Sequence, residues 1–455
     1  MAPGNQRPER LFVERVHLPF VIAGFAIALI GGFTLAILVP IVAAYRGPNL
    51  SFVEHSQLHG HLQTVGFVGF FIVGVGYRLV PRFTGHQLTF QRVIAPSFYL
   101  LSAGILLRFI SQPISDLGPF GAIMALSGWL ELAGIACFAL VVTTTVRTAV
   151  RRGDPTALLF ATGAIWFLVQ AALNAAWLTE AWRNEATVLA GDRTSVLALI
   201  LFFGVHLSFI FAVALRSFPV FFNATRPGWG AEHAALALAQ IGLIAALVAG
   251  LIDVAGDPRP RVLEATGLIL LGAAFVAFPA FTGWWRAPVK LRPGSQPFAL
   301  TLQAAMAWCT LAGLLLIGYS LDALFTSSAV ATAPIDAVRH IVGLGVVTMT
   351  IVGMAQLILP EFAGERLRRP PAPWRGAAFA VALTAATALR AAARLFDGQL
   401  TSEVSYWLMG IAGIIAFAAI VMLAFFFFRA LDINRHQARH DPVLGQTQNT
   451  DCHPD

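Results

Sequence analysis

Residues 195–221 read SVLALILFFGVHLSFIFAVALRSFPVF, and this stretch decides the class of fold. Arg216, close to its end, is its one charged residue. A helix needs about 20 consecutive apolar residues to cross the hydrocarbon core of a membrane. Because the stretch is longer than that and so poor in charge, it predicts a membrane-spanning helix.

The rest of the chain has the same character. Of its 455 residues, 57% are hydrophobic and 12% are charged, which is about half the charged fraction of a soluble globular protein. A soluble chain of this length would form two or three domains, each with a charged surface. The chain has too few charges for such surfaces, so the composition predicts that lipid surrounds most of the molecule.

Dividing the chain at polar and Pro/Gly clusters predicts an all-α, polytopic membrane protein with twelve transmembrane helices. These spans cover residues 18–44, 59–80, 93–111, 118–146, 156–178, 195–221, 233–253, 262–286, 297–321, 337–360, 374–394 and 405–428. The first is longer than the apolar core of a signal peptide (about 7–15 residues), so we expect it to be retained. The predicted organisation is an N-terminal arm (1–17), a transmembrane domain (18–428) and a polar tail (429–455) that we expect to be disordered.

The basic residues predict the orientation. Of the 30 arginines and lysines, 21 fall on the side of the predicted bundle that holds both chain ends, and 9 fall on the other side. Because basic residues are in excess in cytoplasmic loops, we expect both termini in the cytoplasm and the bundle in a bacterial inner membrane. The net charge of +7 is thus explained by topology, and we expect no nucleic acid partner.

Three of the predicted spans resemble one another. His61 precedes Pro81 by twenty residues in the second span, and His340 precedes Pro360 by twenty in the tenth. The sixth span ends similarly, with His206 thirteen residues before its proline. This period of four spans predicts three pseudo-repeated groups of four helices. The alternative is that Gly-rich helices ending in proline are simply common in membranes.

Five histidines lie in the outer half of the predicted spans, namely His55, His59, His61, His206 and His340. A polar ring inside a membrane is costly unless it finds a partner, so such residues indicate function. The alternative for any one of them is a hydrogen-bonded packing role. Because neutral imidazole suits haem iron and copper, histidines that converge from repeated helices are candidate ligands of either metal.

Two arginines, Arg390 and Arg394, lie one turn apart at the outer end of the eleventh span. They are level with His61 and His340, and the propionates of a haem need cations at the membrane edge. The alternatives are that they extend to the interface or pair with Asp397. They are candidate propionate ligands.

Other motifs are missing or weak. The sequence has no nucleotide-binding loop, no His-Glu-x-x-His pattern and no Ser-His-Asp order. Its three cysteines form no Cys-x-x-Cys, so neither a disulfide framework nor a covalent haem is predicted. We expect Glu131 to form a helix–helix hydrogen bond or to belong to a proton path.

Three short segments resemble one family. His59-Gly-His61, followed by Gly66 and Pro81, resembles the His-x-His helix of the NnrS family, which are haem- and copper-associated membrane proteins linked to nitric oxide metabolism. Residues 339–353 resemble that family's tenth helix, and residues 215–222 are similar to its Arg-x-x-Pro-x-Phe segment. The resemblance extends over the twelve-helix plan.

That family in turn resembles the catalytic subunit of haem-copper oxidases and nitric oxide reductases, which has twelve helices in three groups of four. The likeness implies that His340 and either His61 or His59 are the axial ligands of a b-type haem. It also implies that His206 binds a second metal, for which copper is the candidate.

The sequence departs from the oxidase pattern as well. Arg390 and Arg394 match the propionate-binding arginines, but the tenth span has one histidine where an oxidase has two. The seventh span lacks a His-His pair, and Ile210 stands where an oxidase has a tyrosine. We therefore expect neither standard oxygen reduction nor proton pumping.

Three functions remain open from the sequence. The first is a haem-binding membrane protein, with copper as a second metal, in nitric oxide or nitrosative-stress metabolism, with nitric oxide or a redox protein as partner. Any enzyme activity would then be that of an oxidoreductase acting through the haem. The second is a transporter or proton-coupled carrier that uses the outer histidines. The third is a cofactor-assembly factor.

Overall fold

The fold is described by a computed structural model, which covers residues 16–151, 153–291, 293–328, 330–362 and 374–440. Within these ranges the chain forms helices and no β-strand. Twelve helices are long and apolar enough to cross a membrane. The predicted class, an all-α polytopic membrane protein, is thereby confirmed.

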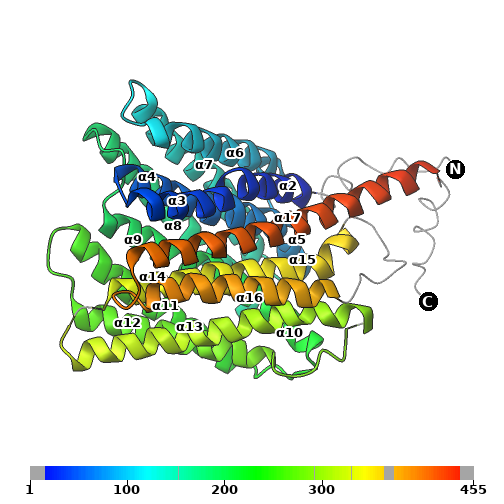
Figure 1. The fold of residues 1–455 in the computed structure, drawn as a ribbon. Coiled ribbons are helices and arrows are strands. Elements are labelled where there is room, and N and C mark those ends of the chain that lie inside the picture. Colours follow the sequence, from blue (N-terminus) through cyan, green and yellow to red (C-terminus); the bar gives the residue numbers. More distant parts are fainter. Residues whose placement is uncertain (1–15, 152, 292, 329, 363–373, 441–455) are drawn as a thin grey trace, which may run out of the picture.

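We number the membrane spans 1–12 in chain order, and four of them contain a π-helical segment (Figure 1). Span 1 consists of α2 (His17–Ile27), η1 (Ala28–Gly32) and α3 (Phe33–Arg46), and span 2 consists of α4 (Leu50–His61), η2 (Leu62–Gly69) and α5 (Phe70–Thr84). Spans 3, 4 and 5 are the single helices α6 (Ile94–Ser111), α7 (Phe120–Arg147) and α8 (Pro155–Arg183). Span 6 consists of α9 (Gly191–Leu199), η5 (Ile200–His206) and α10 (Leu207–Phe221).

The other six complete the bundle. Spans 7, 8 and 9 are the single helices α11 (Trp229–Val254), α12 (Arg261–Thr282) and α13 (Ala299–Phe325). Span 10 consists of α14 (Thr332–His340), η7 (Ile341–Thr348) and α15 (Met349–Phe362). Spans 11 and 12 are the helices α16 (Trp374–Leu395) and α17 (Ser402–His440). Short 3₁₀ segments are η3 (Gln91–Val93), η4 (Gln112–Ile114) and η6 (Pro293–Phe298).

Spans 2, 6 and 10 form the interior of the bundle. In spans 2 and 6, 78% of the most apolar window is buried inside the protein, and in span 10 67%, against 33–56% in the other spans. The π-helical segments η2, η5 and η7 contact one another. Every fourth span along the chain, beginning with span 2, thus lies in the interior. The division of the bundle into three similar groups of four helices stays a prediction.

The outer spans pack closely around this centre. Neighbours along the chain, such as α6 and α7 or α12 and α13, lie side by side (Figure 1). Between α12 and α13, a Cβ atom on Gly272 would lie 2.6 Å from the Gly313 carbonyl oxygen, so only glycine allows this approach. Close packing matters here because lipid gives helices no hydrophobic reason to associate.

The three interior spans begin earlier on the histidine side than predicted, at Leu50, Gly191 and Thr332. Polar side chains had marked these turns as loops. In the structure the protein satisfies them: the Gln57 Nε2 donates to the Leu189 carbonyl oxygen at 2.7 Å, and the Leu189 N–H donates to the Gln57 Oε1 at 3.0 Å. Partners within the protein therefore let a polar turn continue the helix.

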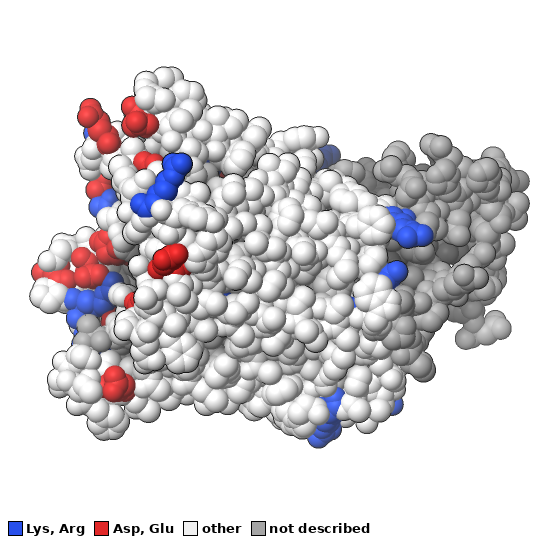
Figure 2. All heavy atoms as spheres, in the orientation of Figure 1, with Lys and Arg blue, Asp and Glu red and all other residues white. Residues whose placement is uncertain are grey.

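Charge divides the two ends of the bundle, as Figure 2 shows. A broad belt without charged side chains separates an end with many acidic residues from an end where the visible charges are basic. The first described helix starts (His17) and the last finishes (His440) at the basic end (Figure 1). Helix α17 continues through residues 429–440 of the predicted tail, while residues 1–15 and 441–455 lie outside the described chain.

Candidate functional site

The candidate histidines lie where the interior helices change pitch. His61 ends α4 directly before η2, His206 is the last residue of η5, and His340 ends α14 directly before η7. A π-helical turn holds an extra residue and shifts the side chains that follow, and such segments are frequent at functional sites. The three histidines thus share a local backbone feature that the sequence did not reveal.

His59 and His340 hold their ring protons on the same nitrogen although they lie on spans 2 and 10. The His59 Nδ1 donates to the Gly32 carbonyl oxygen at 2.9 Å, and the His340 Nδ1 donates to the Asp336 carbonyl oxygen at 2.8 Å. Since a carbonyl only accepts, Nδ1 carries the proton and Nε2 carries the lone pair in both rings. The two imidazoles lie within range of electrostatic interaction with each other.

Two arginines and a carboxylate surround this histidine pair. The Arg390 Nη2 and the Arg394 Nε each lie close to the Asp336 Oδ2, at 3.2 and 3.0 Å. Arg390 also interacts electrostatically with both His59 and His340. Its Nη1 is buried and has no hydrogen-bond partner among the described residues, so this donor is left unsatisfied within the protein.

The members of this group remain accessible. The His340 side chain is 31% exposed, those of Asp336 and Arg394 29%, and that of Arg390 16%. A molecule could therefore reach the histidine and the arginines together. We refer to His59, His340, Asp336, Arg390 and Arg394 as the outer histidine group.

His61 has a different partner. Its Nε2 lies 2.9 Å from the Glu131 Oε1 of α7, and the two side chains are 8% and 2% exposed. Beyond Glu131, the buried Arg108 donates from Nε to the Gln112 Oε1 at 2.7 Å. The ring nitrogen that a haem would need is thus engaged toward span 4, and Glu131 forms one of the helix–helix contacts expected for it.

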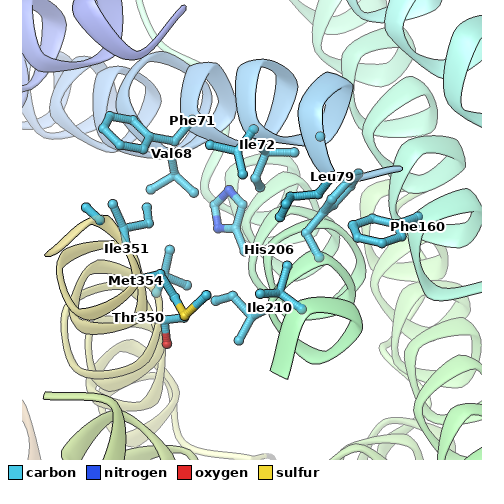
Figure 3. A pocket seen from close by; sticks show the side chains of 16 residues that line it. Val68, Phe71, Ile72, Leu79, Phe160, His206, Ile210, Thr350, Ile351 and Met354 are labelled. Carbon is cyan, nitrogen blue, oxygen red and sulfur yellow. The ribbon is translucent and has the colours of Figure 1, made fainter. Parts of the chain in front are cut away.

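His206 lies apart from both of these groups, in an apolar part of the interior. Its Nε2 donates to the Thr64 carbonyl oxygen at 3.1 Å, and its side chain lines a cavity of about 110 Å³ (Figure 3). Within the described residues, no three or more His, Cys, Asp or Glu side chains are grouped so that they could hold a metal ion. The structure therefore distributes the four predicted metal ligands over three environments.

The sequence did not single out Asp336, which links the group. The carboxylate stands four residues before His340, so the helical spacing placed it on the same face as the histidine. Its i,i+4 distance to His340 was therefore a usable signal. The contact from Gly32 to His59 had no comparable signal, because it joins two different spans.

Comparison with known proteins identifies the family. The NnrS protein family matches residues 16–435. The chain belongs to this family. No curated protein matches the chain.

The fold of this chain also resembles that of solved structures. One described as "Cryo-EM structure of a heme-copper terminal oxidase dimer provides insights into its catalytic mechanism" is similar with a TM-score of 0.66. The similarity covers 93% of this chain and 84% of that chain at 11% sequence identity. At that identity the likeness shows a shared fold and assigns no role to any residue of this chain.

Proposed function

We propose that this NnrS-family protein binds a b-type haem between spans 2 and 10, with His59 and His340 as its axial ligands. The observation that carries the proposal is the matched tautomer of the two rings. In each ring a backbone carbonyl holds the Nδ1 proton, which leaves the Nε2 lone pair for iron. Histidine ligands in metalloproteins are oriented in this way by an acceptor that binds the N–H of the ring nitrogen facing away from the metal.

The surrounding charges fit the rest of a haem. Its two propionates are anions, and the outer histidine group contains Arg390 and Arg394. The unpartnered Nη1 of Arg390 is the donor that a propionate oxygen would satisfy. The Asp336 carboxylate lies beside the Arg390 Nη2 and the Arg394 Nε, and Asp397 lies 3.7 Å from the Arg394 Nη1, which supports an anion-binding role for this cluster.

His61 is the less suitable of the two alternatives that the His-x-His segment leaves open. To bind iron its Nε2 would have to leave Glu131, and the carboxylate would lose this partner in a buried place. His59 needs no such change, because its hydrogen bond already uses Nδ1. We therefore assign His61 and Glu131 to the contact between spans 2 and 4.

A haem supplies redox and ligand-binding chemistry when it is bound, and this chain's residues determine its setting. Spans 2 and 10 position the two imidazoles that would hold the iron, and the arginines would hold the propionates. The apolar bundle excludes water from the rest. Because the described residues offer no cluster of three metal ligands, the proposal includes no binuclear centre for oxygen reduction.

The family and the fold, rather than particular side chains of this chain, support a link to nitric oxide metabolism and to copper. We propose a role in nitrosative-stress metabolism on this basis. The role of His206 as a copper ligand stays a prediction, since its described surroundings are apolar. The charge difference between the two ends (Figure 2) supports an inner-membrane location with both termini in the cytoplasm.

The test is to purify the protein in detergent from haem-replete cells and to record its visible spectrum, its haemochrome and its iron and copper content. We expect b-type haem and iron in amounts stoichiometric with the chain. A colourless, metal-free protein would contradict the proposal and would favour the transporter or assembly-factor alternatives.

A further inference from the structure

The cavity at His206 lies inside the bundle between spans 2, 5, 6 and 10. It has a volume of about 110 Å³, and most of its lining is aliphatic or aromatic, with side chains such as Phe71, Phe160 and Ile210 (Figure 3). The polar residues of the lining are His206 and Thr350, and Met354 adds a thioether. Among the described residues no charged side chain lines it, so the cavity suits a neutral molecule.

The two polar groups of this lining are incompletely bonded. The Nε2 of His206 donates to the Thr64 carbonyl oxygen, so its Nδ1 carries a lone pair, and that atom is buried without a partner. The hydroxyl of Thr350 is also buried without a partner. His206 is 1% exposed and Thr350 5% exposed, and leaving such buried groups unbonded destabilises a protein.

These two observations define the missing partner. A lone pair on Nδ1 requires a donor, which for a neutral molecule is a hydroxyl or N–H group. The remainder of the cavity requires an apolar body, and a cavity of comparable size in another protein holds benzene. A water molecule could satisfy the polar atoms, but it would leave the apolar space unfilled.

We propose that the His206 cavity is a binding site for a neutral, ring-sized molecule with a hydroxyl group, of the phenol or hydroquinone class. The hydroxyl donates to the Nδ1 of His206, and the ring packs against the aliphatic and aromatic lining. Molecules of this class dissolve in lipid and can reach a cavity within a membrane-spanning bundle. The proposal is independent of haem binding at the outer histidine group.

The test compares phenol with toluene, which has nearly the same shape and lacks the hydroxyl donor. Equilibrium binding of each is measured on the purified protein in lipid nanodiscs, with empty nanodiscs to subtract partitioning into lipid. One neutral hydrogen bond to a buried acceptor corresponds to about a tenfold preference for phenol. We expect saturable phenol binding with that preference, and we expect His206→Leu to abolish the preference.

A further variant keeps the test informative if His206→Leu folds poorly. Ile210→Phe should reduce binding of both probes by filling the cavity. Absence of saturable phenol binding in the wild type, or an unchanged preference in folded His206→Leu protein, would overturn the proposal. Stoichiometric copper that is lost in His206→Leu would also overturn it, because it would assign the site to a metal. Haem content, measured in the same samples, reports separately on the outer histidine group.

Discussion

The outer histidine group and the His206 cavity lie on the same interior helices but differ in what surrounds the imidazole. His59 and His340 are accompanied by two arginines and a carboxylate and remain partly accessible. His206 is enclosed by apolar side chains and a single backbone acceptor. The difference teaches that a histidine in a membrane is given its role by its neighbours: charges suit a haem with propionates, whereas an apolar enclosure suits a neutral molecule.

The largest effect should come from the two proposed haem ligands, His59 and His340. We expect His340→Ala and His59→Ala each to lose their haem, because one imidazole cannot replace the pair. His61→Ala, two residues away, should keep it. Haem per folded protein, measured by haemochrome after gel filtration, separates these results. Haem loss in His61→Ala together with retention in His59→Ala would reverse our assignment.

The arginines should have the next largest effect on haem. A hydrogen bond between charged groups contributes about 1.5–3 kcal/mol, so Arg390→Gln should weaken haem affinity by about ten- to a hundredfold. The rate of haem transfer to an apo-protein acceptor provides the measurement. Arg46→Gln, on an exposed arginine at the same end of the bundle, is the matched control. Equal transfer rates in the two variants would remove Arg390 from the site.

The contact between spans 2 and 4 should affect stability rather than haem. Replacing Glu131 by alanine leaves the buried His61 without its partner, at a cost of about 1–3 kcal/mol. Unfolding in mixed micelles measures the free energy of unfolding. The double variant His61→Leu/Glu131→Leu should lose less of that free energy than the single variants His61→Leu and Glu131→Leu lose in sum. Additive losses would show that the two side chains do not interact.

The smallest effect should be that of the His206 cavity on the haem. We expect His206→Leu to retain the haem content and visible spectrum of the wild type, because no contact joins His206 to the described members of the outer group. A spectral shift or haem loss in folded His206→Leu protein would show that the two regions are one site.

Much of the fold could be predicted because long apolar runs have few alternatives to a membrane span. The predicted first residues of spans 2, 6 and 10 were too late in the sequence, because α4, α9 and α14 begin earlier, and the reason is physical. Hydropathy scores Gln57 as a loop residue, whereas tertiary hydrogen bonds satisfy it within a helix. The π-helical segments were equally invisible, since they arise from packing between spans.

The choice between His59 and His61 shows what the site required beyond the sequence. Residues two apart on a helix point about 200° apart, so the two rings face different neighbours. Which ring faces span 10 depends on the rotation of α4, and packing against spans 1 and 4 determines that rotation. The arginines were predictable by contrast, because position alone placed them level with the histidines.

The central claim is that His59 and His340 both coordinate one iron, and near-infrared magnetic circular dichroism of the oxidised protein tests it most directly. We predict the band of bis-histidine ligation in the wild type and in His61→Ala, and a shift to the histidine–methionine position in His340→Met. A wild-type spectrum without the bis-histidine band, or an unchanged band in His340→Met, would contradict the assignment.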